Sequence, residues 1–263
     1  MDSTQNITPQ PALAIDIEKD KLSYLIYGHG MKPEMATIKF TGSDLKQALE
    51  SAVYDTPRLL EEYHHTTIVL NSQHFVVMPA ELMSSASQVF QASFSNLEGE
   101  LMTSKVKNTD VAIVCDVPKG VTAFLKRTFG NPEMLHHLAP LIAYCTVSYA
   151  EDNGCLHINV NEKKAHIVAT RNGKLQLANT YPYHSLDDVI YFALAAFKEC
   201  HFDSRADKIL LSGDNDLRAL LAEKLRQWVA FAMPELFPVQ ALAALGNEAI
   251  KLPFNLVALS MYT

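Results

Sequence analysis

Residues 12–18, Ala-Leu-Ala-Ile-Asp-Ile-Glu, align without a gap with residues 155–161, Cys-Leu-His-Ile-Asn-Val-Asn. In both stretches apolar residues alternate with other residues, which is the period of a β-strand with one apolar face. The alignment continues through the next hairpin, where Lys21 is identical to Lys164. Both halves of the chain therefore begin with the same pattern, which predicts an internal duplication.

The elements that follow each stretch also repeat in order. Each half is expected to form a three-strand meander, then a helix, then a further strand and helix. The expected strands are residues 13–17, 22–27, 35–40 and 66–70 in the first half, and 155–160, 164–171, 174–181 and 208–211 in the second. These patterns predict an α/β fold with two lobes, residues 12–150 and 151–263, after a disordered N-terminus of residues 1–11.

Capping residues mark the start of the helices that follow the meanders. Ser185 and Asp188 have capping-box spacing before a helix expected over residues 185–200. Thr41 and Asp44 are expected to form the matching pair before a helix over residues 43–53. The stretch 66–71 resembles 207–212, which adds a second match between the halves.

Other stretches of the chain predict elements outside this repeat. Residues 75–78 and 111–117 have strand patterns, Pro79 is expected to open a helix, and helices are expected over 119–129 and 216–229. The apolar stretch 231–245 contains Pro234 and Pro238, so it cannot be one regular helix. It is expected either to pack in the core or to form a docking groove for a partner.

Composition excludes several classes of protein. Charged residues make up 19% of the chain and hydrophobic residues 48%, which allows a sizeable core. A net charge of -7 without a basic run argues against nucleic acid as a partner. The four cysteines form no Cys-x-x-Cys pair, and no apolar stretch reaches the ~20 residues of a membrane span. A protein of the cytoplasm, without a signal peptide, is expected.

Two lobes that each begin with a three-strand meander resemble the actin, sugar-kinase and heat-shock ATPase superfamily, whose core is ribonuclease H-like. The second half is most similar to the type IV pilus-assembly actin-like proteins, in residues 156–161, in Asn172-Gly173-Lys174 and in the helix from Ser185. The whole chain also resembles a bacterial family of unknown function to which the actin-like ATPase fold is assigned. The resemblance implies a nucleotide cleft between the lobes.

In active members of the superfamily each hairpin opens as Asp-hydrophobic-Gly, and glycine lets the backbone approach phosphate. This chain keeps Asp16 but has Glu18 in place of the first glycine, and Asn159 and Asn161 replace both residues in the second hairpin. The loop Ser212-Gly213-Asp214 stands where the superfamily has a glycine-rich adenosine loop. The chain has only 10 glycines, against about 18 for average composition. These seven residues are the candidate nucleotide site.

Two functions remain open at this stage. The departures at Glu18 and Asn161 favour a non-catalytic scaffold that binds another protein, with a degenerate cleft and no cofactor. The alternative is a Mg-ATP-binding protein or ATPase that uses Asp16, Glu18 and the 212–214 loop. A homodimer is possible. No metal site is expected, since the pairs His64-His65 and His136-His137 point apart and are expected at a surface or interface. A nuclease built on Asp16 and Asp116 is disfavoured by the acidic surface.

Overall fold

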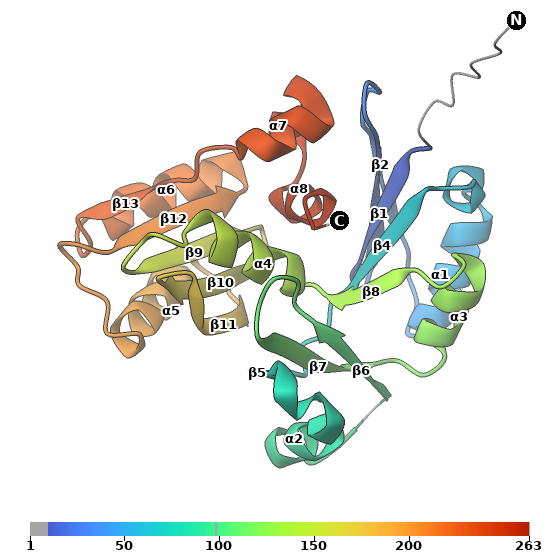
Figure 1. The fold of residues 1–263 in the computed structure, drawn as a ribbon, viewed down its shortest axis with the longest axis horizontal. Helices are drawn as coiled ribbons and strands as arrows, with labels where there is room; N and C mark the ends of the chain where they lie inside the picture. Colours follow the sequence, from blue (N-terminus) through green and yellow to red (C-terminus); the bar gives the residue numbers. More distant parts are fainter. Residues whose placement is uncertain (1–9, 98, 263) are drawn as a thin grey trace, which may run out of the picture.

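The chain forms two five-stranded sheets with the same strand order (Figure 1). The computed structural model describes residues 10–97 and 99–262. The first sheet has the order β3-β2-β1-β4-β8, with β1 Ala12–Ile17, β2 Lys21–Tyr27, β3 Glu34–Lys39, β4 His65–Leu70 and β8 Glu133–His136. The second has the order β11-β10-β9-β12-β13, with β9 Cys155–Val160, β10 Lys164–Arg171, β11 Lys174–Pro182, β12 Lys208–Gly213 and β13 Phe231–Pro234. The predicted duplication is confirmed in strand order.

The two sheets also agree in register. Asp16 pairs with Ser23 and Val69 in the first sheet, and Asn159 pairs with His166 and Ser212 in the second. Each residue of this part of the first sheet thus corresponds to the one 143 positions later, as Asp20 does to Lys163. The gap-free alignment from residue 12 has this offset. The expected match of 66–71 with 207–212 is wrong by two residues, because Val69 corresponds to Ser212.

Helices cover the outer face of each sheet. The first sheet packs against α1 Leu45–Tyr54, the 3-10 helix η1 Pro57–Leu60 and α3 Val121–Thr128; the second packs against α5 Leu186–Glu199 and α6 Asn215–Leu225. The alternation of β1 explains this packing, since Leu13, Ile15 and Ile17 all point to the helices of their own half. The capping box of Ser185 and Asp188 forms as predicted.

Two helices lie between the sheets and cover their inner faces (Figure 1). Helix α4, Ala139–Ser148, follows the first sheet but contacts β10 and β11 of the second. Helix α8, Phe254–Ser260, follows the second sheet but contacts β1 and β2 of the first, and it also packs on α4. The segment before α8 comprises α7 Val239–Leu245 and the 3-10 helix η3 Gly246–Lys251. The central core is therefore shared by both halves.

A third sheet is inserted in the first half and has no counterpart in the second, where α6 follows β12 directly. Its order is β5-β7-β6, with β5 Phe75–Pro79, β6 Glu100–Lys105 and β7 Val111–Val117, and it is covered by η2 Ala80–Ser85 and α2 Ala86–Ser93. Tyr262, beyond α8, donates its hydroxyl to Lys105 O and accepts a bond from Lys107 N. Tyr262 thereby connects the inserted sheet to the central core by hydrogen bonds.

Some element boundaries differ from the sequence expectations. Helix α1 starts after Asp44, whose side chain accepts from Gln47 N. Pro79 ends β5 and is the N-cap of the 3-10 helix η2, and the α-helix α2 begins only at Ala86. The helix predicted over 119–129 is α3, which spans only Val121–Thr128, and the helix predicted over 216–229 is α6, which spans Asn215–Leu225. The expected disorder of residues 1–11 falls mostly outside the described residues. No helix among the described residues is long and apolar enough to cross a bilayer.

The shared core predicts a large effect of a truncation in α8. Leu259 is 0% exposed within it. We expect Leu259→Ala to lower the free energy of unfolding by about 2–5 kcal/mol, because it leaves a cavity between the sheets. Leu220→Ala, on the exposed side of α6, is the matched control and is expected to have little effect. Urea unfolding followed by circular dichroism measures both; equal effects would show that α8 is peripheral.

Candidate functional site in the cleft between the sheets

The seven candidate residues from the sequence lie together at one end of the inner faces. Six of them line a groove of about 410 Å³: Asp16, Glu18, Asn159, Asn161, Gly213 and Asp214. Ser212 lies behind them, buried, and donates its hydroxyl to Asn159 Oδ1 at 3.2 Å. The two repeated hairpins and the loop after β12 thus form one cleft, because equivalent strand ends face each other.

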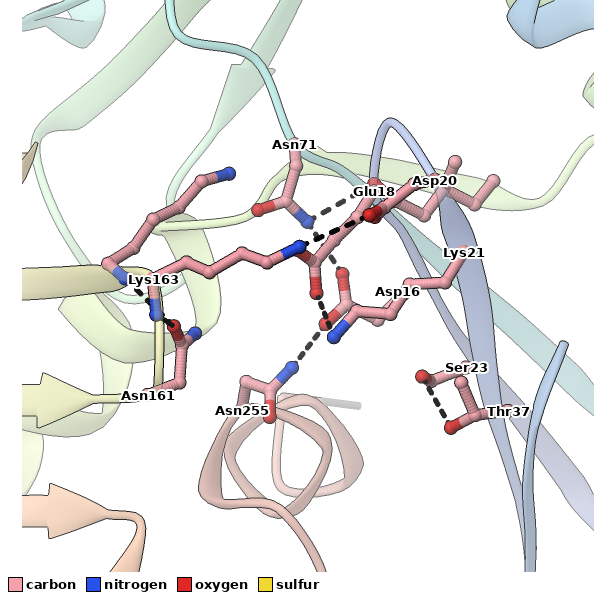
Figure 2. A network of polar contacts seen from close by, with 12 residues as sticks. Asp16, Glu18, Asp20, Lys21, Ser23, Thr37, Asn71, Asn161, Lys163 and Asn255 are labelled. Atoms are coloured by element: carbon pink, nitrogen blue, oxygen red, sulfur yellow. Dashed lines mark hydrogen bonds and ion pairs between the residues drawn. The ribbon is translucent and has the colours of Figure 1, made fainter. Parts of the chain in front are cut away.

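Among the seven candidate residues, Asp16 has a strongly shifted pKa. Its side chain is buried, and it accepts hydrogen bonds from Asn71 Nδ2 at 2.7 Å and from Asn255 Nδ2 of α8 (Figure 2). Burial, with a smaller contribution from Glu18, raises the pKa of the Asp16 carboxyl to about 7. The Asp16 carboxyl group is therefore hydrogen-bonded by two side-chain amides of the protein itself, those of Asn71 and Asn255.

The hairpin residues use their polar groups within their own turns. Glu18 N donates to Lys21 O at 2.9 Å, and the Glu18 carboxylate pairs with Lys21 Nζ at 2.9 Å. In the second hairpin Asn161 N donates to Lys164 O at 3.1 Å, and Asn161 Oδ1 accepts from the backbone of Lys163 and Lys164. Both turns are closed on themselves.

The tips of the two hairpins are joined across the cleft. Lys163 Nζ lies 3.2 Å from Asp20 Oδ2, and these two residues occupy equivalent positions of the repeat (Figure 2). The hydrogen bond from Lys163 holds the pKa of Asp20 below its usual value. Both side chains are well exposed, so the pair is worth little in stability. It nevertheless joins the hairpins of the two halves.

The 212–214 loop is explained by local geometry. Gly213 has φ +98, and a Cβ there would lie 2.0 Å from Val160 O. Asp214 N donates to Val160 O at 2.9 Å, and the Asp214 side chain caps α6 by accepting from Asp216 N and Leu217 N. Glycine is thus required here by the approach of β9.

Histidines lie behind the groove, around an inner cavity of about 30 Å³ that His137 and His166 help to line. Thr180 Oγ1 lies 2.8 Å from His137 Nε2 and 2.9 Å from His166 Nδ1. Burial lowers the pKa of His136 and of His166 to about 3. His136 is fully buried, so the expected surface or interface position is wrong for it. Within residues 10–97 and 99–262, no group of three or more His, Cys, Asp or Glu side chains is placed to hold a metal ion.

Comparison with known proteins identifies the family of this chain. A family model described as "Protein of unknown function (DUF3822)" matches residues 2–230. The chain belongs to this family. The match stops before α7 and α8, so the helix that supplies Asn255 lies beyond it. No curated protein has a significant match to the sequence.

Solved structures establish the fold. A Bacteroides thetaiotaomicron VPI-5482 protein with actin-like ATPase fold and unknown function has a TM-score of 0.76 at 21% identity, covering 97% of this chain and 96% of that one. The PilM-PilN type IV pilus biogenesis complex matches at 0.56 and 13%, covering 95% and 97%. The ethanolamine utilization protein EutJ from Carboxydothermus hydrogenoformans matches at 0.52 and 7%, covering 98% and 92%. The chain has the actin-like ATPase fold, and the predicted fold class and resemblance are confirmed.

Sequence reasoning missed Asn71, Lys163 and Asn255, which contact residues of the two hairpins. Asn71 corresponds to Asp214 under the offset of the repeat, and the alignment of 66–71 with 207–212 already set it opposite Ser212, so the repeat itself pointed to this residue. Asp20 and Lys163 also occupy equivalent positions of the repeat, so their proximity could have been predicted from the same alignment. No sequence pattern pointed to Asn255, because only the packing of α8 on β1 brings its side chain to Asp16.

The raised pKa of Asp16 predicts a pH-dependent stability. The unfolded chain loses the proton near the ordinary pKa of 3.8, whereas the folded protein keeps it up to about pH 7. Stability therefore falls as the pH rises through this interval, by roughly 4 kcal/mol at about 1.4 kcal/mol per pKa unit. Asp16→Asn should stabilise the protein at pH 8 and hardly change it at pH 4, as measured by urea unfolding.

Asp20→Asn is the control in the same hairpin. Because the pKa of Asp20 is lowered, its small effect should have the opposite sign. An Asp16→Asn effect that is equal at pH 4 and pH 8 would contradict a raised pKa at this position.

Proposed function

We propose that this protein is a non-catalytic, actin-like protein-binding scaffold whose cleft no longer holds a nucleotide. The observation that carries the proposal is Glu18. Its carboxylate stands in the first hairpin where a bare backbone would have to approach phosphate, and it lies near the Asp16 carboxyl, whose pKa it raises. An anionic phosphate chain would meet like charge at this point.

The other residues of the cleft do not fit a nucleotide's phosphates either. The inner cavity behind the groove, about 30 Å³, has room for water only. The groove itself, about 410 Å³, is larger, but the Glu18 side chain lines it. The Glu18 and Asn161 amides, which would face phosphate oxygens, already donate within their own turns. Asp16, the expected partner of a hydrated magnesium, is occupied by Asn71 and Asn255. No catalytic step is therefore derived for this cleft.

A protein partner is supported by two observations. One similar structure is a complex of two proteins, the PilM-PilN type IV pilus biogenesis complex. In addition, large apolar side chains of this chain are exposed near β13, including Trp228 at 62% and Leu236 at 85%. We place the scaffold in the cytoplasm, because all four cysteines are free thiols, as is usual in a reducing compartment.

Thermal unfolding with Mg-ATP tests the proposal. A ligand that binds only the folded state raises the free energy of unfolding by about 2.7 kcal/mol when its concentration is a hundred times its dissociation constant. We expect no shift in melting temperature at millimolar Mg-ATP. A clear shift that Asp16→Asn weakens would overturn the proposal in favour of a magnesium-dependent ATP-binding protein.

A double variant probes the cause. Glu18→Gly with Asn161→Gly removes both side chains from the hairpins, and it is expected to bind Mg-ATP more tightly than the wild type does. The control is Lys19→Gly with Glu162→Gly, at the neighbouring exposed positions, which should behave as the wild type. If both doubles behave alike, Glu18 and Asn161 are not what excludes the nucleotide.

A further inference from the structure

The two five-stranded sheets end in four outer strands, of which β8, β11 and β13 are closed to a further strand. On β8 the outward N–H of His136 donates to Ser104 Oγ at 3.3 Å. On β11 the outward N–H of Thr180 donates to Asn179 Oδ1 at 2.8 Å. On β13 the outward position is Pro234, which has no N–H to donate. A side chain or a proline therefore hinders pairing at each of these edges.

The outer edge of the fourth strand, β3, is open. Phe40 N donates to Asp20 O at 3.0 Å, so even-numbered residues of this hairpin bond to β2 and odd-numbered residues turn their backbone groups outward. The outward residues are Met35, Thr37 and Lys39. In the part of the chain that the structure describes, no hydrogen bond reaches their outward N–H and C=O groups. Strand β3 therefore presents a row of backbone donors and acceptors to an added strand.

A groove lies on each side of this edge. On the inner face, Met35 and Thr37 line the groove of about 410 Å³, and Thr37 Oγ1 lies 2.9 Å from Ser23 Oγ of β2 (Figure 2). On the outer face, a second groove of about 560 Å³ lies between β3 and α1, and Ile38 and Phe40 line it. Because the side chains of a strand point alternately to its two faces, a strand added to β3 would send side chains into both grooves.

The walls of the two grooves favour different side chains. The charged residues of the outer groove are Asp44, Asp55 and Lys39, so negative charge exceeds positive charge there. Its apolar residues can cover the aliphatic stem of a lysine or arginine whose charged head reaches a carboxylate. The inner groove is lined by Met35 and by Ile250, which is 60% exposed and suits an apolar side chain.

We propose that the edge of β3 binds an extended segment of a partner protein, which adds to the first sheet as a further strand and alternates apolar with basic residues. Backbone hydrogen bonds hold the segment, and the two grooves select its side chains. The basic residues suit a chain of net charge -7. This inference rests on the proposed protein-binding role and specifies the kind of partner.

A second copy of this chain fits the edge less well. If β3 of another copy paired there with its inner face kept on the same side, its alternate residues Glu34, Ala36 and Ile38 would enter the outer groove. That strand would bring a carboxylate, and no cation, toward Asp44 and Asp55.

A labelled eight-residue peptide of alternating valine and lysine is the probe, and fluorescence anisotropy measures its binding. Thr37→Pro removes an outward N–H, and proline is tolerated where a strand edge faces solvent. We expect this variant to bind the peptide about tenfold more weakly or worse. Thr37→Val keeps the N–H and is the matched control, which should bind as the wild type does. A peptide with glutamate in place of lysine is also expected to bind about tenfold more weakly.

Circular dichroism checks that both variants fold. If Thr37→Pro does not fold, the wild type is measured with two peptides, N-methylated at the lysines or at the valines. A strand pairs through one edge, so only one of these two peptides should bind.

Several results overturn the inference. They are no binding of the valine–lysine peptide to the wild type, equal binding by Thr37→Pro, equal weakening by Thr37→Val, equal binding of the glutamate peptide, or equal binding of both methylated peptides. Self-association of the wild type that Thr37→Pro abolishes, as seen by light scattering, would also overturn it, because a second copy would then occupy the edge. The Mg-ATP measurement uses no peptide, so failure at β3 is distinguishable from failure of the proposed empty cleft.

Discussion

The crossed packing of α4 and α8 is the constraint on which the rest of the structure depends. Each sheet covers its outer face with helices of its own half. On the inner faces, α4 follows the first sheet but packs on the second, and α8 follows the second sheet but packs on β1 and β2 of the first as well as on β12. Neither half can bury its inner face alone. This exchange holds equivalent strand ends opposite each other, and it is the reason that residues 143 positions apart, such as Asp20 and Lys163, meet at all.

That same packing determines the chemistry of the cleft. Helix α8 carries Asn255 to the Asp16 carboxyl, while Asn71 approaches it from β4's end, so a buried carboxyl acquires two amide donors. Such donors offset part of the cost of burial, yet the pKa of Asp16 stays near 7 because burial and Glu18 outweigh them. A fold whose relatives include ATPase-like proteins can thus keep its aspartate for an internal contact, and fold alone does not assign function.

Much of the repeated part of the fold could be predicted from sequence, because period-two alternation and capping boxes are local signals. The meanders, the Ser185 cap and the grouping of the seven cleft residues follow from residues 12–40, 155–200 and 208–214. The inserted sheet was only partly predicted, since β6 has a mixed burial pattern. Helix α4 is apolar all round and gives no amphipathic period. Asn255 and the buried histidines depend on contacts distant in sequence. The lobe boundary at residue 150 stays a prediction.

The central claim is that the two hairpins are closed on themselves and offer a nucleotide's phosphates no free backbone donors. A crystal structure grown with Mg²⁺ and a non-hydrolysable ATP analogue tests it most directly. The account predicts that Asp20 still meets Lys163, that Asn255 still donates to Asp16, and that no analogue lies between the hairpins. An analogue bound there, with its phosphates against the backbone of Glu18 and Asn161, would contradict the account.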